Sequence, residues 1–223
     1  QNCIIMNAKE LEKILTGIRA GTISVDEAME KLRDFPYTDL GFARIDHHRE
    51  MRTGYPEIVY CAGKTPEQVR AIFDVMNGHE NNIIGTRAEK EMFSYISPFF
   101  PEAEYYAIAR IISIKKKDIV PPASKIAIIT AGTSDIPVAE EAAVTAELLG
   151  NDVVRIYDAG VAGIHRLVDK LPEIRACRVS IVIAGMEGAL ASVVGGLVNM
   201  PVIAVPTSVG YGASFEGISA LLA

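Results

Sequence analysis

The sequence contains no tryptophan, and its three cysteines, Cys3, Cys61 and Cys177, are few for 223 residues. An odd number of scattered cysteines excludes a disulfide framework, and their spacing fits no zinc site. Free thiols are typical of a reducing compartment. Together with the lack of a signal-peptide pattern in the first residues, this predicts a cytoplasmic protein.

Positive charge is also scarce. There are 22 lysines and arginines against 28 aspartates and glutamates, which gives a formal net charge of -6, and the sequence pI is about 5.3. A chain this acidic lacks the broad basic surface that binds nucleic-acid backbones, so we expect no nucleic-acid partner. One local site for a small anion remains compatible with this charge balance.

Charge is nearly absent from residues 179–205, where Glu187 is the only charged side chain. The run is long enough to cross a bilayer. Four glycines and a proline interrupt it, which favours strand, turn, helix, turn and strand over one continuous helix, and we expect no membrane partner. The interrupting residues are Gly185, Gly188, Gly195, Gly196 and Pro201.

The N-terminal part begins with two predicted helices. Residues 7–18 have a helical pattern, with Asn7 as the expected N-cap. Ser24 opens the second helix, because Glu27 follows three residues later as in a capping box. Residues 34–56 keep no helical or strand period, so we expect an ordered or ligand-ordered loop.

Three arginines, Arg44, Arg49 and Arg52, lie in this expected loop. Planar guanidinium groups suit oxyanions, so these side chains are candidates for binding the phosphates of a ligand. Solvated loop charge is an equally good interpretation of the same residues.

A small α/β unit follows the loop. We expect its strands at 57–61, 81–87 and 103–114 and its helices at 65–77 and 88–97. Residues 115–117 and 120–122 then form a charged, proline-bearing hinge. The predicted domains are the N-terminal helices at 1–36, a small domain at 37–119 and a larger domain at 120–223.

The C-terminal half alternates between strands and helices. The expected strands are 125–129, 152–157, 178–184 and 201–205, and the expected helices are 135–149, 164–170, 187–198 and 217–223. Continuous apolar strands separated by helices predict a doubly wound parallel sheet covered on both faces. The predicted fold class is therefore α/β, with this sheet in the C-terminal domain and a smaller α/β domain before it.

Ligands bind beyond the carboxyl ends of the strands in such a sheet. Four turns leave these ends, at residues 130–135, 157–166, 184–189 and 206–212. Each turn follows a strand and precedes a helix, so we expect the four to converge on one edge. Spacing alone predicts a small-molecule site, for an anion in particular, and leaves the reaction open.

The first turn has the sequence TAGTSD and comprises Thr130, Gly132, Thr133, Ser134 and Asp135 around Ala131. We expect Gly132 to permit a tight turn and a close backbone approach. Thr133 and Ser134 supply hydroxyls, and Asp135 is expected to cap a helix whose N-terminus attracts phosphate. A capped helix without a ligand is the alternative.

The other turns carry candidate acid–base and binding groups. Glu187 is either an acid–base or ligand-orienting group or a helix-capping residue. Asp158 suits a ligand hydroxyl or a metal ion, or else an ordinary turn. His165 suits proton transfer, although a structural histidine is the commoner case. Further candidates for binding the substrate are Gly188, Ser208 and Tyr211, the last either stacked on a planar ring or packed.

The C-terminal half, roughly Lys125–Ala223, resembles the PurE family of aminoimidazole ribonucleotide carboxylases and mutases. The segment GTSDIPVAEEAA at 132–143 is similar to that family's phosphate and ribose loop. His165-Arg166 is similar to its active-site His-Arg pair, and IAGMEGALASVVGGL at 183–197 is similar to its helix entry. The resemblance implies a flavodoxin-like sheet of the PurE type.

Over nearly its whole length the sequence is also similar to the LarB family, which begins the synthesis of the nickel-pincer nucleotide. The similar blocks are 41–65, 130–147, 158–167, 185–193 and 205–212. The block GFARIDHHREMRTGYPEIVYCAGKT at 41–65 is specific, since the PurE family lacks it.

The LarB resemblance implies carboxylation of the pyridinium ring of nicotinic acid adenine dinucleotide, with CO2 or bicarbonate as co-substrate. Cleavage of the phosphoanhydride then gives pyridinium-3,5-biscarboxylate mononucleotide and AMP. Thr133, Ser134 and Asp135 would hold phosphate or ribose, and Asp158 and Glu187 would orient groups, move protons or contact Mg²⁺. The resemblance also implies a homo-octamer without a tightly bound cofactor.

In this family a cysteine thiolate adds to the ring and makes it electron-rich enough to attack CO2. That cysteine lies in a loop beyond a helix similar to FEGISALLA, and the sequence stops at Ala223 inside this helix. We therefore expect the nucleophile beyond Ala223. Cys61 ends a strand and is a weaker candidate, because a small buried thiol is the commoner case.

Two alternatives remain at this stage. The first is carboxyl transfer on aminoimidazole ribonucleotide, as in the PurE family, although the block 41–65 speaks against it. The second is a non-catalytic, nucleotide-binding oligomeric module, which the unmatched cysteine favours.

Overall fold

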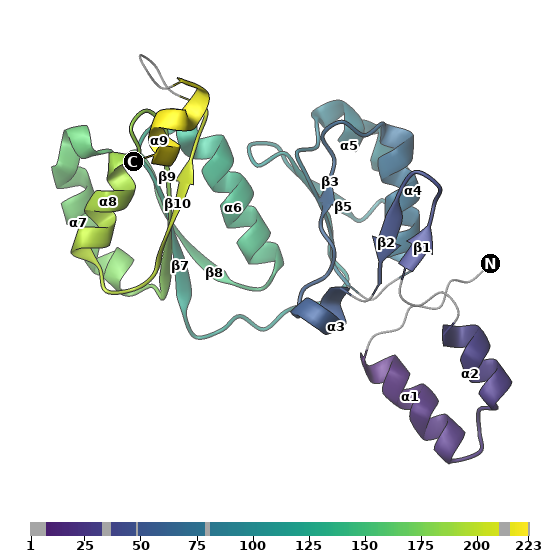
Figure 1. Cartoon of the computed structure of the whole chain (residues 1–223). Coiled ribbons are helices and arrows are strands. Elements are labelled where there is room, and N and C mark those ends of the chain that lie inside the picture. The colour runs from purple at the N-terminus through teal and green to yellow at the C-terminus, as the bar shows by residue number, and fades with distance from the viewer. Residues whose placement is uncertain (1–7, 33–36, 48, 79–80, 210–214, 223) are drawn as a thin grey trace. The chain divides into compact units, whose positions relative to one another are not determined.

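The computed structural model describes residues 8–32, 37–47, 49–78, 81–209 and 215–222. It divides into two compact units. Unit 1 comprises residues 1–105 and 112–117, and unit 2 comprises residues 106–111 and 118–223. Figure 1 shows the chain and labels most of its helices and strands.

Two helices open unit 1, α1 (Ala8–Arg19) and α2 (Val25–Leu32). Ile14 and Ala28 form the centre of their small apolar contact. The predicted capping box is confirmed: Ser24 N–H donates to Glu27 Oε2 (2.9 Å), and Glu27 N–H donates to Ser24 Oγ (3.1 Å). The expected N-cap, Asn7, lies outside the described residues.

The loop predicted at 34–56 is wrong for much of its length. Strands β1 (Tyr37–Asp39) and β2 (Arg44–Asp46) pair antiparallel, and helix α3 (Arg49–Thr53) follows. Each strand has three residues, too few to display a period of two. Gly41 has φ 81° in the turn between them and donates its N–H to Asp39 Oδ1 (2.8 Å).

Unit 1 also contains a four-stranded sheet in the order β3-β4-β6-β5. Its strands are β3 (Val59–Tyr60), β4 (Ile83–Thr86), β5 (Ala103–Tyr106) and β6 (Ile111–Ile114), and its helices are α4 (Pro66–Asn77) and α5 (Lys90–Ile96). The single strand predicted at 103–114 is therefore wrong. A turn between β5 and β6 divides this segment, and Arg110 in the turn has φ 54°. The turn contains no glycine or proline that would have predicted it from the sequence.

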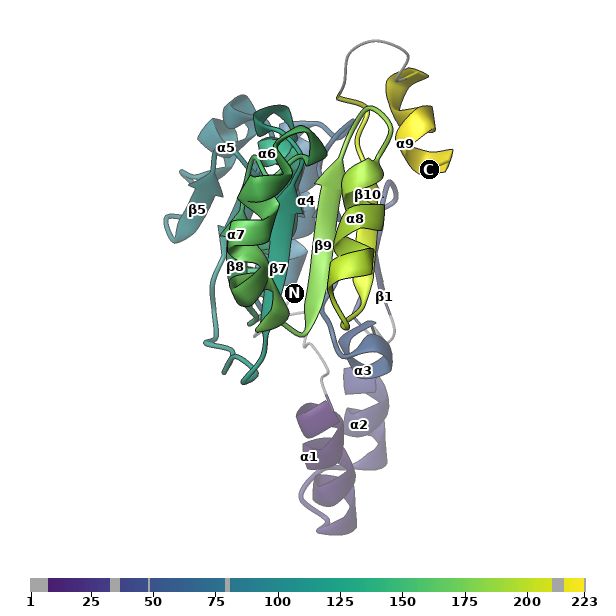
Figure 2. The same ribbon diagram turned by 90° about the vertical axis from the view of Figure 1, so that its left-hand side faces the viewer.

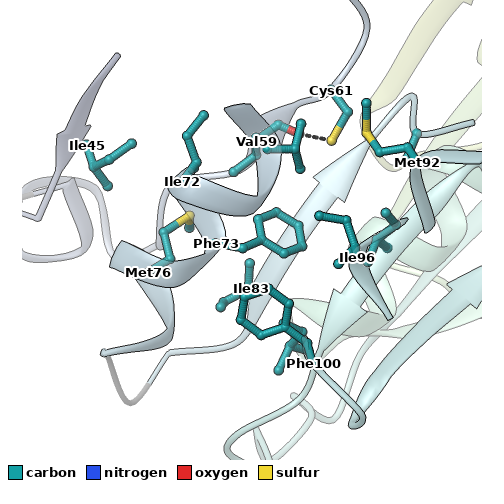
Figure 3. Packing of buried hydrophobic residues seen from close by; sticks show 14 residues of the cluster. Ile45, Val59, Cys61, Ile72, Phe73, Met76, Ile83, Met92, Ile96 and Phe100 are labelled. Carbon is teal, nitrogen blue, oxygen red and sulfur yellow. Dashed lines mark hydrogen bonds between the residues drawn. The ribbon is translucent and has the colours of Figure 1, made fainter. Parts of the chain in front are cut away.

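The core of this sheet forms around Phe73 of α4, which is fully buried (Figure 3). Phe73 meets Phe100 edge to face, with ring centroids 6.0 Å apart. Gly85 of β4 lies directly below, since a Cβ there would come within 2.9 Å of both the Phe73 ring and Cys61 Sγ. The core therefore depends on a close fit between α4 and the sheet.

Unit 2 has the predicted architecture. Its strands run parallel in the order β10-β9-β7-β8 (Figure 2). The strands are β7 (Lys125–Thr130), β8 (Asp152–Ile156), β9 (Val179–Ala184) and β10 (Val202–Pro206), and the helices are α6 (Ile136–Leu148), α7 (Ile164–Arg175), α8 (Ala189–Leu197) and α9 (Ile218–Leu222). The α/β fold class is confirmed.

Helices cover both faces of this sheet, with α7 and α8 on one side and α6 on the other (Figure 1). Alternate residues of β7 divide between the faces. Ile129 packs with Leu167 and Leu190, whereas Ile128 packs with Ala139 and Ala143 of α6. Coverage of both faces explains why the central strands β7 and β9 are almost continuously apolar. Residues 179–205 form β9, α8 and most of β10, and no described helix is long and apolar enough to cross a membrane.

The charged segment before unit 2 begins as part of unit 1. The side-chain oxygen of Asn82 accepts the N–H groups of Lys116 (2.8 Å) and Lys117 (3.0 Å). Lys117 Nζ also donates to Asn81 Oδ1 at 2.6 Å. Asn81 and Asn82 thus hold Lys116 and Lys117 within unit 1, and the longer segment of unit 2 begins at Asp118.

We predict that Phe73→Ala lowers the free energy of unfolding by about 3–5 kcal/mol, because it removes a fully buried ring from a close-packed core. Urea unfolding followed by circular dichroism measures the change. Phe42→Ala is the matched control, because Phe42 is 49% exposed and its loss is expected to cost less than about 0.5 kcal/mol. Equal effects of the two substitutions would contradict this account of the core.

Candidate functional site

The four turns predicted to converge do meet at the carboxyl edge of the unit 2 sheet, called the rim below. Thr130 at the end of β7 accepts two N–H groups from the turn after β8: Asp158 N–H on its Oγ1 (3.0 Å) and Ala159 N–H on its carbonyl oxygen (2.9 Å). Thr207 N–H, after β10, donates to the carbonyl oxygen of Ala184 at the end of β9 (3.0 Å). Thr130 was expected to bind substrate, but it is fully buried and holds the neighbouring turn.

Two glycines allow the turns to approach this closely. A Cβ at Gly160 would come within 2.6 Å of the Ala131 carbonyl oxygen, and a Cβ at Gly185 within 1.9 Å of the Val209 carbonyl oxygen. Gly132 has an ordinary extended backbone (φ −135°), and a Cβ there would meet no protein atom closer than 3.7 Å. The packing of the turns therefore does not require a glycine at this position, and a close approach of its backbone to a ligand stays a prediction.

The TAGTSD turn forms a short 3₁₀ segment, Thr133–Asp135, ahead of α6. Asp135 is 3% exposed, and its carboxylate accepts Gly132 N–H on Oδ2 (3.1 Å) and Thr207 Oγ1–H on Oδ1 (2.8 Å). Asp135 is the N-cap residue of α6, as predicted, but its side chain makes no capping hydrogen bond to that helix. Thr133 and Ser134 are exposed, so their hydroxyls are the groups of this turn that can reach a ligand.

Asp158 and Arg166 form an ion pair on the same rim. Arg166 Nη1 contacts Asp158 Oδ2, and the two side chains are 40% and 48% exposed. Asp158 has φ 57°, a left-handed backbone that its N–H bond to Thr130 helps to hold. His165 is exposed in the first turn of α7. The half-exposed pair thus offers both a carboxylate and a guanidinium group to a ligand.

Glu187 is exposed in the turn between β9 and α8. Helix α8 begins two residues later, so the helix-cap interpretation is wrong. Gly188 precedes α8 and lines an apolar groove with Pro206 and Leu221. Ser208 is exposed in the turn after β10, whereas Tyr211 lies outside the described residues.

The three candidate arginines belong to unit 1. Arg44 on β2 is paired with Asp39, at 3.1 Å between Nε and Oδ2, and lies over the Tyr37 ring. Arg49 is exposed at the start of α3. Arg52 is in α3, but its side chain lies outside the described part. Pairing across the β1–β2 turn therefore accounts for Arg44 without a ligand.

Neither described cysteine has the character of a nucleophile. Cys61 is fully buried, and burial raises its pKa to about 11. Burial also raises the pKa of Cys177, which is 7% exposed. A reactive cysteine needs a stabilised thiolate and access to solvent, and both thiols lack these.

Metal binding was left open for Asp158 and Glu187. Among the described residues, no group of three or more histidine, cysteine, aspartate or glutamate side chains is placed to hold a metal ion. Mg²⁺ usually keeps several waters and binds through one or two carboxylates and substrate phosphates, so the exposed carboxylates of the rim fit it only in that manner.

Sequence reasoning missed Thr207, a buried threonine that joins the turn after β10 to Asp135. A threonine directly after Val205-Pro206 is an ordinary residue for the end of a strand. Only its position at the carboxyl end of the strand could have indicated that it belongs to the site. Arg166 belongs to the His165-Arg166 pair, but the sequence pattern did not identify it as a site residue. The only signal was its position in the first turn of a helix, eight residues after Asp158.

The fold and rim define an α/β protein with a PurE-like carboxylase domain. The family model described as AIR carboxylase matches residues 125–223, and the one described as the LarB/PurE-like N-terminal domain matches residues 37–117. The chain is 37% identical over 226 residues to an uncharacterized protein of Methanocaldococcus jannaschii, covering 96% of this chain and 87% of that relative. The chain belongs to the LarB family.

We predict that Cys61 reacts about 100-fold more slowly with iodoacetamide at pH 8 in the native protein than in urea, because two pKa units separate its pKa of about 11 from its ordinary 9.0. Mass spectrometry of the peptide that contains Cys61 measures both rates. Equal alkylation rates would contradict the burial of this thiol.

The raised pKa of Cys61 also predicts that the free energy of unfolding falls as the pH rises from about 9 to 11, since the unfolded thiol loses its proton first.

Proposed function

We propose that this protein carboxylates the pyridinium ring of nicotinic acid adenine dinucleotide and hydrolyses its phosphoanhydride. A thiolate adds to the ring, and the electron-rich ring forms a carbon–carbon bond to CO2. Loss of the ring proton and departure of the thiolate restore the aromatic cation. Water then cleaves the phosphoanhydride, which releases AMP and leaves pyridinium-3,5-biscarboxylate mononucleotide.

The observation that carries the proposal is the presence, in one chain, of the LarB/PurE-like N-terminal domain at 37–117 and the AIR carboxylase domain at 125–223. A carboxylase domain alone is compatible with several substrates, because one fold serves many reactions. The N-terminal domain is what favours the LarB reaction over the purine reaction.

The rim supplies groups suited to each part of the substrate. The exposed hydroxyls of Thr133 and Ser134 precede the N-terminus of α6, an arrangement that attracts phosphate. The half-exposed pair of Asp158 and Arg166 suits ribose hydroxyls and carboxylate or phosphate oxygens. Exposed His165 and Glu187 suit proton transfer, and we assign Asp135 to holding its turn rather than to the ligand.

Two parts of the catalytic apparatus remain predictions. The thiol that the resemblance implies is not assigned to either described cysteine, because Cys61 and Cys177 are buried and their pKa values are raised. A phosphate clamp remains a prediction for Arg49 and Arg52, whereas Arg44 would first have to leave Asp39.

We expect the full-length protein, incubated with nicotinic acid adenine dinucleotide, ¹³C-bicarbonate and Mg²⁺, to release AMP and a mononucleotide carrying one ¹³C carboxylate. Liquid chromatography with mass spectrometry detects both products, and parallel reactions with EDTA test the need for Mg²⁺. Failure to form either product would contradict the proposal. Turnover of aminoimidazole ribonucleotide instead would favour the PurE reaction, and tight binding without products would favour a non-catalytic module.

We predict that Ser134→Ala raises KM for the dinucleotide about tenfold, because it removes one hydrogen bond to a charged phosphate. Initial rates at saturating bicarbonate measure KM and kcat. Ser94→Ala is the matched control, since Ser94 is an exposed serine of α5 whose hydroxyl donates to the Lys90 carbonyl oxygen (3.0 Å). A normal KM in Ser134→Ala would remove this hydroxyl from the proposed site.

A further inference from the structure

Asp135 and Thr207 are buried polar side chains whose hydrogen bond links two separate turns of the rim. They are 3% and 4% exposed and 72 residues apart in sequence. Asp135 follows β7 and Thr207 follows β10, and these two strands are not neighbours, because β9 lies between them in the sheet. The hydrogen bond between them therefore bridges the carboxyl end of β9.

The hydroxyl of Thr207 must donate in this contact, since a carboxylate oxygen can only accept. Thr207 Oγ1 lies 2.8 Å from Asp135 Oδ1 and 3.4 Å from the Val209 carbonyl oxygen, and its single proton serves the shorter, charge-assisted bond. The other oxygen of Asp135 accepts Gly132 N–H at 3.1 Å. A continuous path thus runs from Thr207 through Asp135 to the turn that begins at Gly132.

The backbone of Thr207 is fixed independently of this path. Its N–H donates to the Ala184 carbonyl oxygen at 3.0 Å, in continuation of the β9–β10 pairing. The hydroxyl therefore projects from a rigid strand end, whereas the segment it restrains is an exposed turn. A group on rigid scaffold that restrains an adjacent ligand-facing turn is well placed to set that turn's geometry.

We propose that Thr207 is a positioning residue: its hydroxyl fixes Asp135 and, through Asp135, holds the 132–134 turn so that Thr133 and Ser134 meet phosphate at a constant geometry. The identity of the ligand rests on the proposed function. The hydrogen-bonded path itself does not, because it exists in the protein without ligand.

The experiment compares Thr207→Val, which keeps the branched shape without the hydroxyl, with Thr207→Ser, which keeps the hydroxyl. Thr145→Val is the matched control, since Thr145 is a half-buried threonine of α6 in the same unit. The measurements are KM and kcat for the dinucleotide, Kd for AMP by calorimetry, and hydrogen exchange of the peptide containing Gly132. If Thr207→Val does not fold, the double variant Thr207→Val/Asp135→Asn, which has no buried charge, replaces it.

We expect Thr207→Val to raise KM and the Kd for AMP about tenfold and to change kcat less than about threefold. Hydrogen exchange of Gly132 N–H should be about tenfold faster in this variant. Thr207→Ser should restore all of these values, and Thr145→Val should leave them unchanged. Faster exchange with unchanged KM and Kd would reduce Thr207 to a structural residue and overturn the proposal. Unchanged exchange would also overturn it.

The two proposals fail separately. A wild type that binds AMP but does not convert the dinucleotide contradicts the proposed function, while Kd and exchange still decide the role of Thr207. A wild type that neither converts the dinucleotide nor binds AMP overturns both.

Discussion

The rim of unit 2 is constrained by one requirement: every polar group buried where the parallel strands end must find a partner in another turn. Asp135 shows this most clearly, because a carboxylate that is 3% exposed is unfavourable unless it is hydrogen-bonded. Its two donors, Gly132 N–H and the Thr207 hydroxyl, come from the turns after β7 and β10. The bond from Thr207 spans the carboxyl end of β9, which lies between β7 and β10 in the sheet, so it joins turns whose strands are not paired with each other.

The sheet of unit 2 was predictable because its strands are five or six residues long, mainly apolar and separated by helices. Unit 1 was harder for a physical reason. Its strands β1 and β2 have three residues each, which is too short to display a periodicity. The turn between β5 and β6 carries Arg110 in a left-handed conformation, where sequence rules look for glycine or asparagine.

The site was predictable in its location and not in its detail. Chain order alone places four turns at one edge, since parallel strands share their carboxyl ends. Exposure within each turn depends on local backbone geometry, which the sequence pattern does not report. Glu187, isolated among apolar residues, is exposed, whereas Asp135, surrounded by hydroxyl residues in the sequence, is buried. Apolar neighbours in the sequence predict the burial of strands and helices, but they do not predict whether a side chain in a short turn is buried.

The polar residues of the rim form two sets, one buried and structural, the other exposed and accessible to a ligand. Thr130, Asp135 and Thr207 are buried and satisfy one another or neighbouring backbone, so a change at any of them disturbs the geometry of a turn. Ser134, His165 and Glu187 are exposed and carry no comparable structural duty, so they can differ without cost to the fold. A PurE-like domain can therefore serve different substrates by exchanging the second set over an unchanged first set, because catalytic specificity resides in the site and not in the fold.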